Sequence, residues 1–432
     1  MLRLPGTLAA ALRLSRVGTA QLATSGLSPL KKPLRGCDRV AVTEFHRPPV
    51  RAVTLGLDKP HPLGDSTVAQ ATEALKLVAH AFEQEGYKVQ TLRISTRPVL
   101  TDLAGWREEE LVGYARSLQQ ALAKVGAEFC SLGPALPAHG PARVLSLAQM
   151  LAGNEALSAS ALVATREGGL CATMAHAAAR AMLWLAGNTK GGLGNFNFAA
   201  LACVAPGTPF FPAAYHRGPS SLSVCLQGAS LVAEALAGGA DLEKVESRVA
   251  EVSRQVAGPV VALAEKSSRR LGVHFGGIDL SPAPDLDDSV VGALELAGLG
   301  TFGTPGTLAL AAAMTAGLRS TGLLTCGYSG LMLPVMEDRL LACRWEQGLV
   351  SVDQLLLWSA VCGTGLDTVP VPGDVPLEVL ARVIVDLGSL AARLGKPLSA
   401  RLLPAPGKHA GETTSFESPY LVNTVVKPLG PG

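Results

Sequence analysis

R-A-V-T-L-G-L-D, at residues 51–58, is a short run rich in apolar and β-branched residues that predicts a strand. Asp65 and Ser66 follow as possible N-caps of an Ala/Leu-rich helix that extends to Phe82. After Gly86 the run 88–94 is again strand-like. The stretch therefore predicts a strand–helix–strand unit.

The same alternation continues along the chain and indicates the fold class. Strands interleaved with helices predict a parallel sheet, and so many units favour closure into a single large α/β barrel with outer helices over an open sheet. Helices are expected at 108–125, 142–152, 171–185 and 231–236, strands around 129, 159–164, 201–204 and 222–226, and further units near Val273, Leu323, Val369 and Val383.

No linker rich in Pro, Ser or Gly divides the chain after residue 50, so residues 51–432 are expected to form one barrel domain. Residues 1–50 are left out of the fold. Up to Gly36 they contain six Arg or Lys residues and no acid, with leucine and alanine between the arginines. This composition is typical of a mitochondrial transit peptide and would place the protein in the matrix. A disordered basic tail or a wrongly assigned start, with a cytoplasmic protein, is the alternative.

The composition excludes several classes of protein. A net charge of +2 with 17% charged residues gives no electrostatic reason to expect a nucleic-acid partner. The eight cysteines lack C-x-x-C spacing, which favours reduced thiols over a disulfide framework or a zinc site. The uncharged run 191–215 contains Asn195, Asn197 and several prolines, so a membrane span is not expected.

Several short motifs occur in an order that resembles the uncharacterised family called domain of unknown function 711. The resemblance implies a fold like the ten-stranded α/β barrel of pyruvate formate-lyase relatives, without the glycyl radical. The motifs are R-A-V-T-L-G (51–56), R-I-S-T-R-P (93–98), P-F-F-P-A-A-Y-H-R-G (209–218), R-L-G-V-H-F-G (270–276), I-D-L-S-P-A-P (278–284), D-S-V (288–290), G-T-P-G-T (303–307), L-P-V-M-E-D (333–338) and G-L-D (365–367).

Two kinds of cofactor chemistry are not expected. T-C-G-Y-S-G, at 325–330, is similar to a glycyl-radical loop, but Leu324 stands where that loop needs arginine, and about a hundred residues follow Gly327. A tight turn is the preferred interpretation. The glycine-rich run 187–195 lacks the order of a phosphate-binding loop, so no nucleotide cofactor is expected.

Acidic residues after predicted strands are the first candidates for a site. Asp279 and Asp288 lie in motifs of the family that the chain resembles. They are expected to be ligands of Mg²⁺ or Ca²⁺, or else to act as an acid or base. Glu337 is the third candidate metal ligand. Asp285 and Asp287 are expected to form a solvated turn, with Asp287 or Asp288 as the N-cap of a helix that starts at Ser289.

Basic and hydroxyl residues complete the candidate site. His216, in A-Y-H-R-G, is proposed as a general acid/base, with a metal-ligand or purely structural role as alternatives. Arg51 and Arg93 would bind a carboxylate or phosphate if they face inward. Thr304 and Thr307 are expected either to bind an anion or to form a helix-entry turn. Lys396, Arg401 and Lys408 are expected to be surface charges.

These features favour an enzyme that acts on a small anionic metabolite by non-radical acid/base chemistry, with or without a divalent cation. The alternative is a catalytically inactive ligand-binding or regulatory barrel, and a homo-oligomeric structural role is the third interpretation. Geometry separates the first two: the enzyme hypothesis requires Asp279, His216 and Glu337 to converge around one enclosed pocket.

Overall fold

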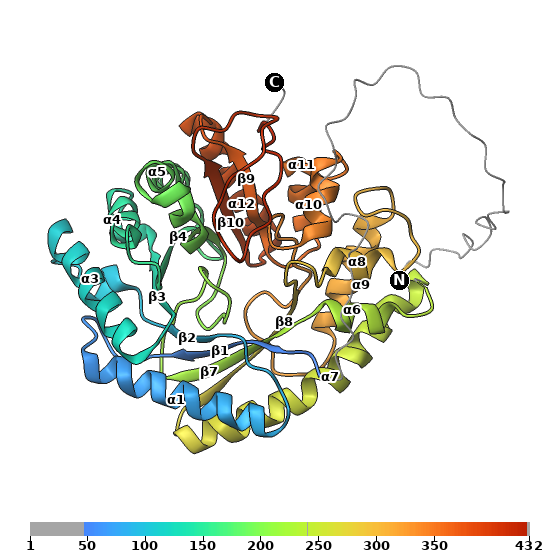
Figure 1. Ribbon diagram of the computed structural model, residues 1–432, viewed down its shortest axis with the longest axis horizontal. Helices are drawn as coiled ribbons and strands as arrows, with labels where there is room; N and C mark the ends of the chain where they lie inside the picture. Colours follow the sequence, from blue (N-terminus) through green and yellow to red (C-terminus); the bar gives the residue numbers. More distant parts are fainter. Residues whose placement is uncertain (1–46, 240, 430–432) are drawn as a thin grey trace, which may run out of the picture. The chain divides into compact units, whose positions relative to one another are not determined.

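The first predicted unit is present in the computed structural model, which describes residues 47–239 and 241–429. Strand β1 (Val50–Gly56) leads into helix α1 (Asp65–Gln84), and the chain returns as β2 (Leu92–Ser95), parallel to β1 (Figure 1). Seven side chains of α1, from Val68 to Phe82, are buried at helical spacing, which explains why this segment forms an amphipathic helix.

The unit belongs to a ten-stranded sheet that confirms the predicted α/β class. Five strands run parallel to one another in the order β1-β2-β3-β4-β6. A parallel pair flanks each side and runs antiparallel to these five: β7-β8 next to β1, and β10-β9 next to β6. The further strands are β3 (Phe129–Ala135), β4 (Leu157–Thr165), the short β5 (Gly169–Leu170), β6 (Phe198–Ala202), β7 (Ser221–Gln227), β8 (His274–Ala283), β9 (Gly365–Pro372) and β10 (Leu398–Ala405).

The segment 325–338 links the two edge strands of the sheet. Its Thr325 forms a bridge with Ile278 on β8, and its Pro334 forms a bridge with Asp367 on β9. The sheet therefore curls until both edges contact the same segment, as a barrel requires. The T-C-G-Y-S-G motif lies at the start of this segment and has a structural role in closing the sheet.

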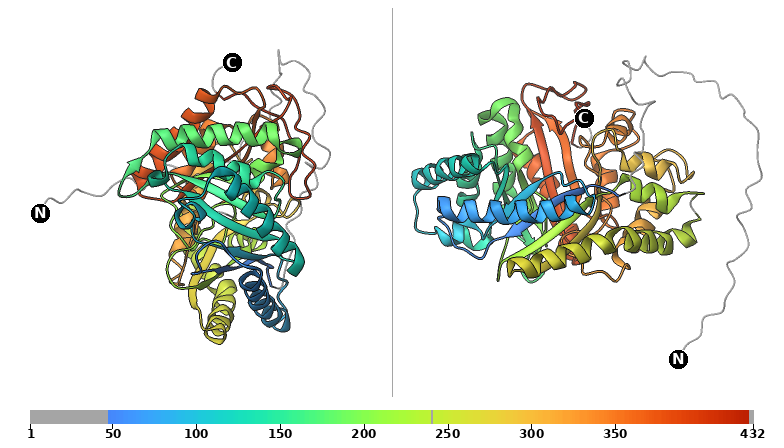
Figure 2. Two further views of the ribbon diagram at one scale, coloured as in Figure 1. Left: turned by 90° about the vertical axis from the view of Figure 1, so that its left-hand side faces the viewer. Right: turned by 60° about the horizontal axis from the view of Figure 1, so that its bottom comes forward.

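Helices lie along the outer side of the curved sheet in all three views (Figures 1 and 2). In α12 (Leu377–Leu394), for example, Leu380, Ile384, Leu387 and Ala391 are buried at helical spacing. The other helices are α2 (Val99–Asp102), α3 (Glu108–Val125), η1 (Pro137–His139), α4 (Ala142–Leu151), α5 (Ala172–Asn188), η2 (Lys190–Asn197), α6 (Ala229–Leu236), α7 (Leu242–Leu271), α8 (Val290–Glu295), α9 (Thr307–Arg319), α10 (Arg339–Glu346) and α11 (Val352–Ser359).

Two of the expected units differ from the structure. The apolar run near Val383 was expected to be a strand but lies within α12, because its buried residues repeat at helical and not at alternate positions. The run near Leu323 forms only the bridge at Thr325. Residues 1–46 of the predicted targeting segment lie outside the described part of the chain. Among the described residues, no helix is long and apolar enough to cross a membrane.

An inner apolar cluster fills the middle of the curved sheet. Its members come from the strands, from the loop after β6 and from the 325–338 segment, and they include Leu162, Val204, Phe210, Tyr215 and Met332. Leu162, Val204 and Tyr215 face one cavity, and Phe210 and Met332 face another. No residue lines both cavities, so the cluster separates them.

Candidate functional site

The first cavity, of about 330 Å³, lies among residues at or near the beginnings of β1, β2, β3, β4 and β6 and early in β9 and β10. Arg51 on β1, Arg93 on β2 and Glu337 of the 325–338 segment line it, so three of the predicted site residues share one cavity. Asp367 on β9 and Arg401 on β10 complete its charged wall. We call this space the barrel cavity.

Arg401 holds the two carboxylates of the barrel cavity. Its Nε donates to Asp367 Oδ1 at 2.7 Å, and its Nη2 donates to Glu337 Oε1. Burial disfavours the charge of Arg401, yet the two adjacent carboxylates outweigh burial and raise its pKa. Burial raises the pKa of the Glu337 carboxyl, against the opposing effect of Arg401 and with a further upward contribution from Asp367. Burial is thus the largest influence on the pKa of Glu337, and the paired Arg401 opposes it.

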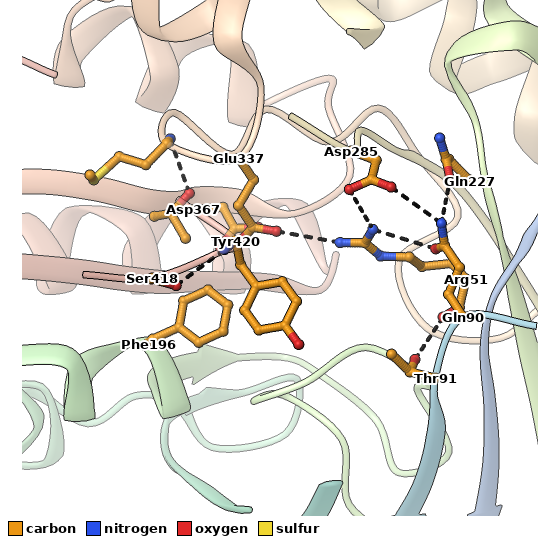
Figure 3. A network of polar contacts seen from close by, with 12 residues as sticks. Arg51, Gln90, Thr91, Phe196, Gln227, Asp285, Glu337, Asp367, Ser418 and Tyr420 are labelled. Carbon is orange, nitrogen blue, oxygen red and sulfur yellow. Dashed lines mark hydrogen bonds and ion pairs between the residues drawn. The ribbon is translucent and has the colours of Figure 1, made fainter. Parts of the chain in front are cut away.

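Arg51 connects Glu337 to the rim of the cavity (Figure 3). Its guanidinium lies 3.8 Å from Glu337 Oε2 and 3.7 Å from Asp285 Oδ1, distances longer than those of a bidentate pair. Gln90 also links the rim, because its Nε2 donates to Gln227 Oε1 at 2.6 Å and to Asp285 Oδ2 at 3.3 Å. Arg51 is thus shared between two carboxylates and can accept another anionic partner.

Arg93 differs from the other two arginines because it has no carboxylate partner among the described residues. It is 8% exposed, and its guanidinium lies between the rings of Phe129 and Phe211, with centroids 5.5 and 5.3 Å away. Its polar contacts are with Thr91 Oγ1 at 3.0 Å and the Pro209 carbonyl oxygen at 3.3 Å. Burial lowers the pKa of Arg93 to about 10, so it remains charged at neutral pH. The buried charge is thus met by neutral oxygens and aromatic rings, and not by a directly paired carboxylate.

Hydroxyl groups also face the barrel cavity. Ser158 Oγ and Thr364 Oγ1 are buried and have no hydrogen-bond partner among the described residues. Tyr328 donates to Ser399 Oγ at 3.0 Å, so this pair is satisfied internally. Buried polar atoms without partners normally find water or a ligand. The cavity therefore offers a positive charge and two free hydroxyls to a polar guest.

Aromatic rings border the cavity near the C-terminal segment. Tyr420 stacks on Phe196 with centroids 5.9 Å apart and an interplanar angle of 5° (Figure 3). The Arg401 guanidinium lies 4.9 Å from the centroid of the same Phe196 ring. The side chains of Phe196 and Tyr420 thus form an apolar wall next to the charged cluster.

Asp279, a candidate catalytic residue and metal ligand, is fully buried and does not line either cavity. Its carboxylate accepts hydrogen bonds from Ser281 N and Oγ, at 2.9 and 2.7 Å, and from the amides of Tyr328 and Ser329, at 2.8 and 3.0 Å. A Cβ atom on Gly327 would lie 2.1 Å from Asp279 Oδ2, which explains the glycine there. Its oxygens are thus occupied in holding the 325–338 segment.

His216 lies at the other cavity, away from Glu337. Its Nε2 is 3.1 and 3.0 Å from the carbonyl oxygens of Gly218 and Pro219, so Nε2 carries the proton. Nδ1 is buried without a partner against the backbone of Gly56. Burial lowers the pKa of His216, in spite of the two carbonyls. The ring is thus fixed in its loop by the two carbonyl oxygens.

The remaining candidates lie outside both cavities. Asp288 accepts a hydrogen bond from Gln227 and belongs to the buried network behind the rim. The N-cap of α8 is Ser289, in place of the predicted Asp287 or Asp288, and Asp287 pairs with Arg339. Thr304 Oγ1 donates to the Thr301 carbonyl at 2.6 Å, and Thr307 Oγ1 accepts from the Gly303 amide at 3.0 Å, so both hydroxyls stabilise the turn before α9.

The enzyme hypothesis required Asp279, His216 and Glu337 to converge around one pocket. The structure does not bring these three residues together. Among the described residues, no group of three or more His, Cys, Asp or Glu side chains is arranged to hold a metal ion. The charged cluster that does form contains Arg51, Arg93 and Glu337, together with Asp367 and Arg401.

Asp367 and Arg401 are the site residues that sequence reasoning missed. Arg401 was expected on the surface, but it is 7% exposed. The signal was available in L-S-A-R-L-L-P, where one charge interrupts an apolar strand. Such a charge in a buried strand requires a partner. Asp367 ends the G-L-D motif, and it is that partner.

Comparison with known proteins supports the resemblance seen in the motifs. The sequence profile of the family described as Uncharacterised ACR (DUF711) matches residues 42–417. The chain belongs to this family. It is 29% identical to a UPF0210 protein of Carboxydothermus hydrogenoformans over 397 residues, which cover 85% of this chain and 88% of the relative. A UPF0210 protein of Methanopyrus kandleri is 30% identical, with 84% of this chain and 87% of the relative covered. One from Corynebacterium glutamicum is 27% identical, with 88% of each chain covered.

Proposed function

We propose that this DUF711 member is an enzyme that binds a small anionic metabolite in the barrel cavity and acts on it by non-radical acid/base chemistry. The observation that carries the proposal is Arg93, a buried arginine that lines the cavity without a carboxylate partner. A carboxylate or phosphate group of the metabolite would supply the missing negative charge. Phe129 and Phe211 hold the guanidinium in place, so little side-chain entropy is lost on binding.

Glu337 is the proposed acid/base. It lines the same cavity, and burial raises the pKa of its carboxyl, the direction that favours proton exchange with a ligand. Arg51 and Arg401 would stabilise its charged form when it has lost its proton. Ser158 and Thr364 would donate hydrogen bonds to, or accept them from, polar groups of the metabolite.

A divalent cation is not part of this proposal. The oxygens of Asp279 are taken by four hydrogen bonds, and both Glu337 and Asp367 are paired with Arg401. A cation would have to displace a positively charged arginine from these carboxylates, which electrostatics disfavours.

A catalytically inactive ligand-binding barrel is the second candidate function. The observation that favours it is the pairing of Glu337 with Arg401, which restrains the carboxylate that the enzyme hypothesis needs. Under this alternative, the anion would bind to Arg93 and remain unchanged.

A screen of carboxylated and phosphorylated metabolites by thermal shift, followed by product analysis, tests the two candidates. For an enzyme, Glu337→Gln should keep the ligand-induced shift and abolish turnover. For a binding protein, no metabolite that stabilises the wild type would be converted. Loss of the shift in Arg93→Met, with the shift kept in Arg180→Met on the exposed face of α5, would place the ligand in the barrel cavity.

We also propose, from the basic and acid-free composition of residues 1–36, that the chain is imported into the mitochondrial matrix and processed. Cell fractionation and mass spectrometry of the endogenous N-terminus test this proposal. A protein in the cytoplasmic fraction that still begins near Met1 would contradict it.

A further inference from the structure

The second cavity, of about 780 Å³, is formed by the loops that follow β2, β3, β4 and β6. It contains the Y-H-R-G motif, which the proposed function does not use. Ligands of parallel α/β sheets commonly bind at the carboxyl ends of strands, and four parallel strands end here. We call this space the carboxyl-end cleft.

Three arginines and one acid give the carboxyl-end cleft its charge. Arg97 follows β2, Arg166 follows β4, and Arg217 belongs to the loop after β6, whereas Glu167 is the one acid that lines the cleft among the residues that the structure describes. Arg166 and Arg217 make no hydrogen bond or ion pair with any other described residue, and both are exposed. Two guanidiniums are therefore free to bind an anion.

Arg97 is held in position by a buried acid. Its Nη2 donates to Asp102 Oδ1 at 2.6 Å, and the Asp102 side chain is 3% exposed. Asp102 Oδ2 in turn accepts a hydrogen bond of 3.0 Å from the His61 amide. Because this chain of contacts fixes one end of the guanidinium, Arg97 can present its remaining N–H groups to a ligand without losing much conformational freedom.

His216 positions Arg217, its neighbour in the chain, by fixing the loop that carries it. The imidazole Nε2–H donates to the carbonyl oxygens of Gly218 and Pro219, and the His216 amide donates to the Thr96 carbonyl at 2.8 Å. The loop that carries Arg217 is thereby tied to the end of β2, where Arg97 begins the next loop. His216 is a positioning residue here.

We infer that the carboxyl-end cleft is a second anion site, separate from the barrel cavity, and that it binds the phosphate group of a small phosphorylated molecule. Arginine guanidiniums from three different loops around one space match the several oxygens and the double charge of a phosphate better than a single carboxylate. The larger volume leaves room for the rest of the molecule next to the apolar side chains of Leu136, Leu162 and Val204.

Titration calorimetry with inorganic pyrophosphate as the probe tests this inference on the full chain. The wild type should bind, and Arg166→Gln/Arg217→Gln should lose about tenfold or more in affinity, since each charge-assisted hydrogen bond contributes about 1.5–3 kcal/mol. Arg180→Met, on the exposed face of α5, should bind pyrophosphate as the wild type does, because Arg180 lines neither cavity. His216→Asn should weaken binding less than the double substitution, because Arg217 would keep its charge and lose only the fixed position of its loop.

Other outcomes would overturn the inference. They are an absence of pyrophosphate binding by the wild type, equal binding by the double variant, or loss of binding in Arg180→Met. Tricarballylate, a carboxylate probe, separates the chemical classes, and tighter binding of this probe than of pyrophosphate at Arg166 and Arg217 would contradict the phosphate assignment. The metabolite screen with Glu337→Gln and Arg93→Met tests the proposed function separately, because neither residue lines the carboxyl-end cleft.

Discussion

The carboxylate of Asp279 lies against the Cα atom of Gly327 and accepts hydrogen bonds from the amides of the next two residues. This contact holds the segment that connects both edges of the sheet. The feature that was most similar to a radical loop in the sequence is therefore a structural turn, and the aspartate that was expected to do chemistry is what stabilises it.

The Asp279–Gly327 contact predicts an unusually large effect of a single methyl group. Gly327→Ala should destabilise the fold by about 2–4 kcal/mol, because the new Cβ would displace a buried carboxylate from its donors. Gly395→Ala is the matched control, with φ of +61° against +62° but no atom within 4 Å of the added Cβ. It should lose only the roughly 1–2 kcal/mol of a left-handed alanine. Urea unfolding measures the free energy of both variants. Equal losses would contradict the proposed effect of the Asp279–Gly327 contact.

Among the residues of the barrel cavity, Arg401 is expected to reduce stability most when it is replaced. Arg401→Met would leave Asp367 buried without its cation and Glu337 with only the more distant Arg51, and should cost about 3–5 kcal/mol of unfolding free energy. The triple variant Arg401→Met/Glu337→Gln/Asp367→Asn removes both charges and should recover a large part of this loss. Chemical denaturation of the two variants checks the claim, and a triple variant that is less stable than the single one would refute it.

His61 predicts a dependence of stability on pH. It is 5% exposed, it contacts Tyr114 Oη and Thr96 Oγ1, and burial lowers its pKa from 6.5 to about 4. Between these two pH values the unfolded chain binds a proton that the folded chain does not bind. The unfolding free energy should therefore fall as the pH is lowered from 6.5 to 4, by about 3 kcal/mol for this group.

The contribution of His61 can be isolated by comparison with His61→Gln. The variant should be less stable at pH 7, and its stability should fall less steeply between pH 6.5 and 4 than that of the wild type. All other groups are the same in both proteins, so their contributions cancel in the difference. Parallel pH profiles of the two proteins would show that His61 does not titrate as the structure requires.

The sequence was sufficient for the fold class, since periodicity distinguishes strands from helices wherever one face is buried. The first unit and the helix 108–125 were placed well for this reason. Val383 was misplaced because V-I-V is β-branched, and its helical spacing is visible only with the residues on either side. β10 was missed because Ser399 and Arg401 interrupt its apolar run, although every residue of the strand is buried.

The candidate site was only partly predictable because sequence order does not reveal which side of a strand end a residue faces. Arg51 and Arg93 were placed correctly near strand ends, and both line the barrel cavity. His216 also follows a strand, but its loop leads to the opposite cavity. Asp279 lies within β8 and faces the closing segment, a contact between residues about fifty positions apart that no local pattern contains.

The central claim is that Arg93 binds the anionic group of a small molecule in the barrel cavity, and the most direct test is calorimetric titration of the tightest ligand from the metabolite screen. The account predicts that Arg93→Met weakens binding by about tenfold or more, because a charge-assisted hydrogen bond contributes about 1.5–3 kcal/mol. Arg93→Lys should weaken binding less, and Arg180→Met should leave it unchanged. Equal affinity of the wild type and Arg93→Met would contradict it.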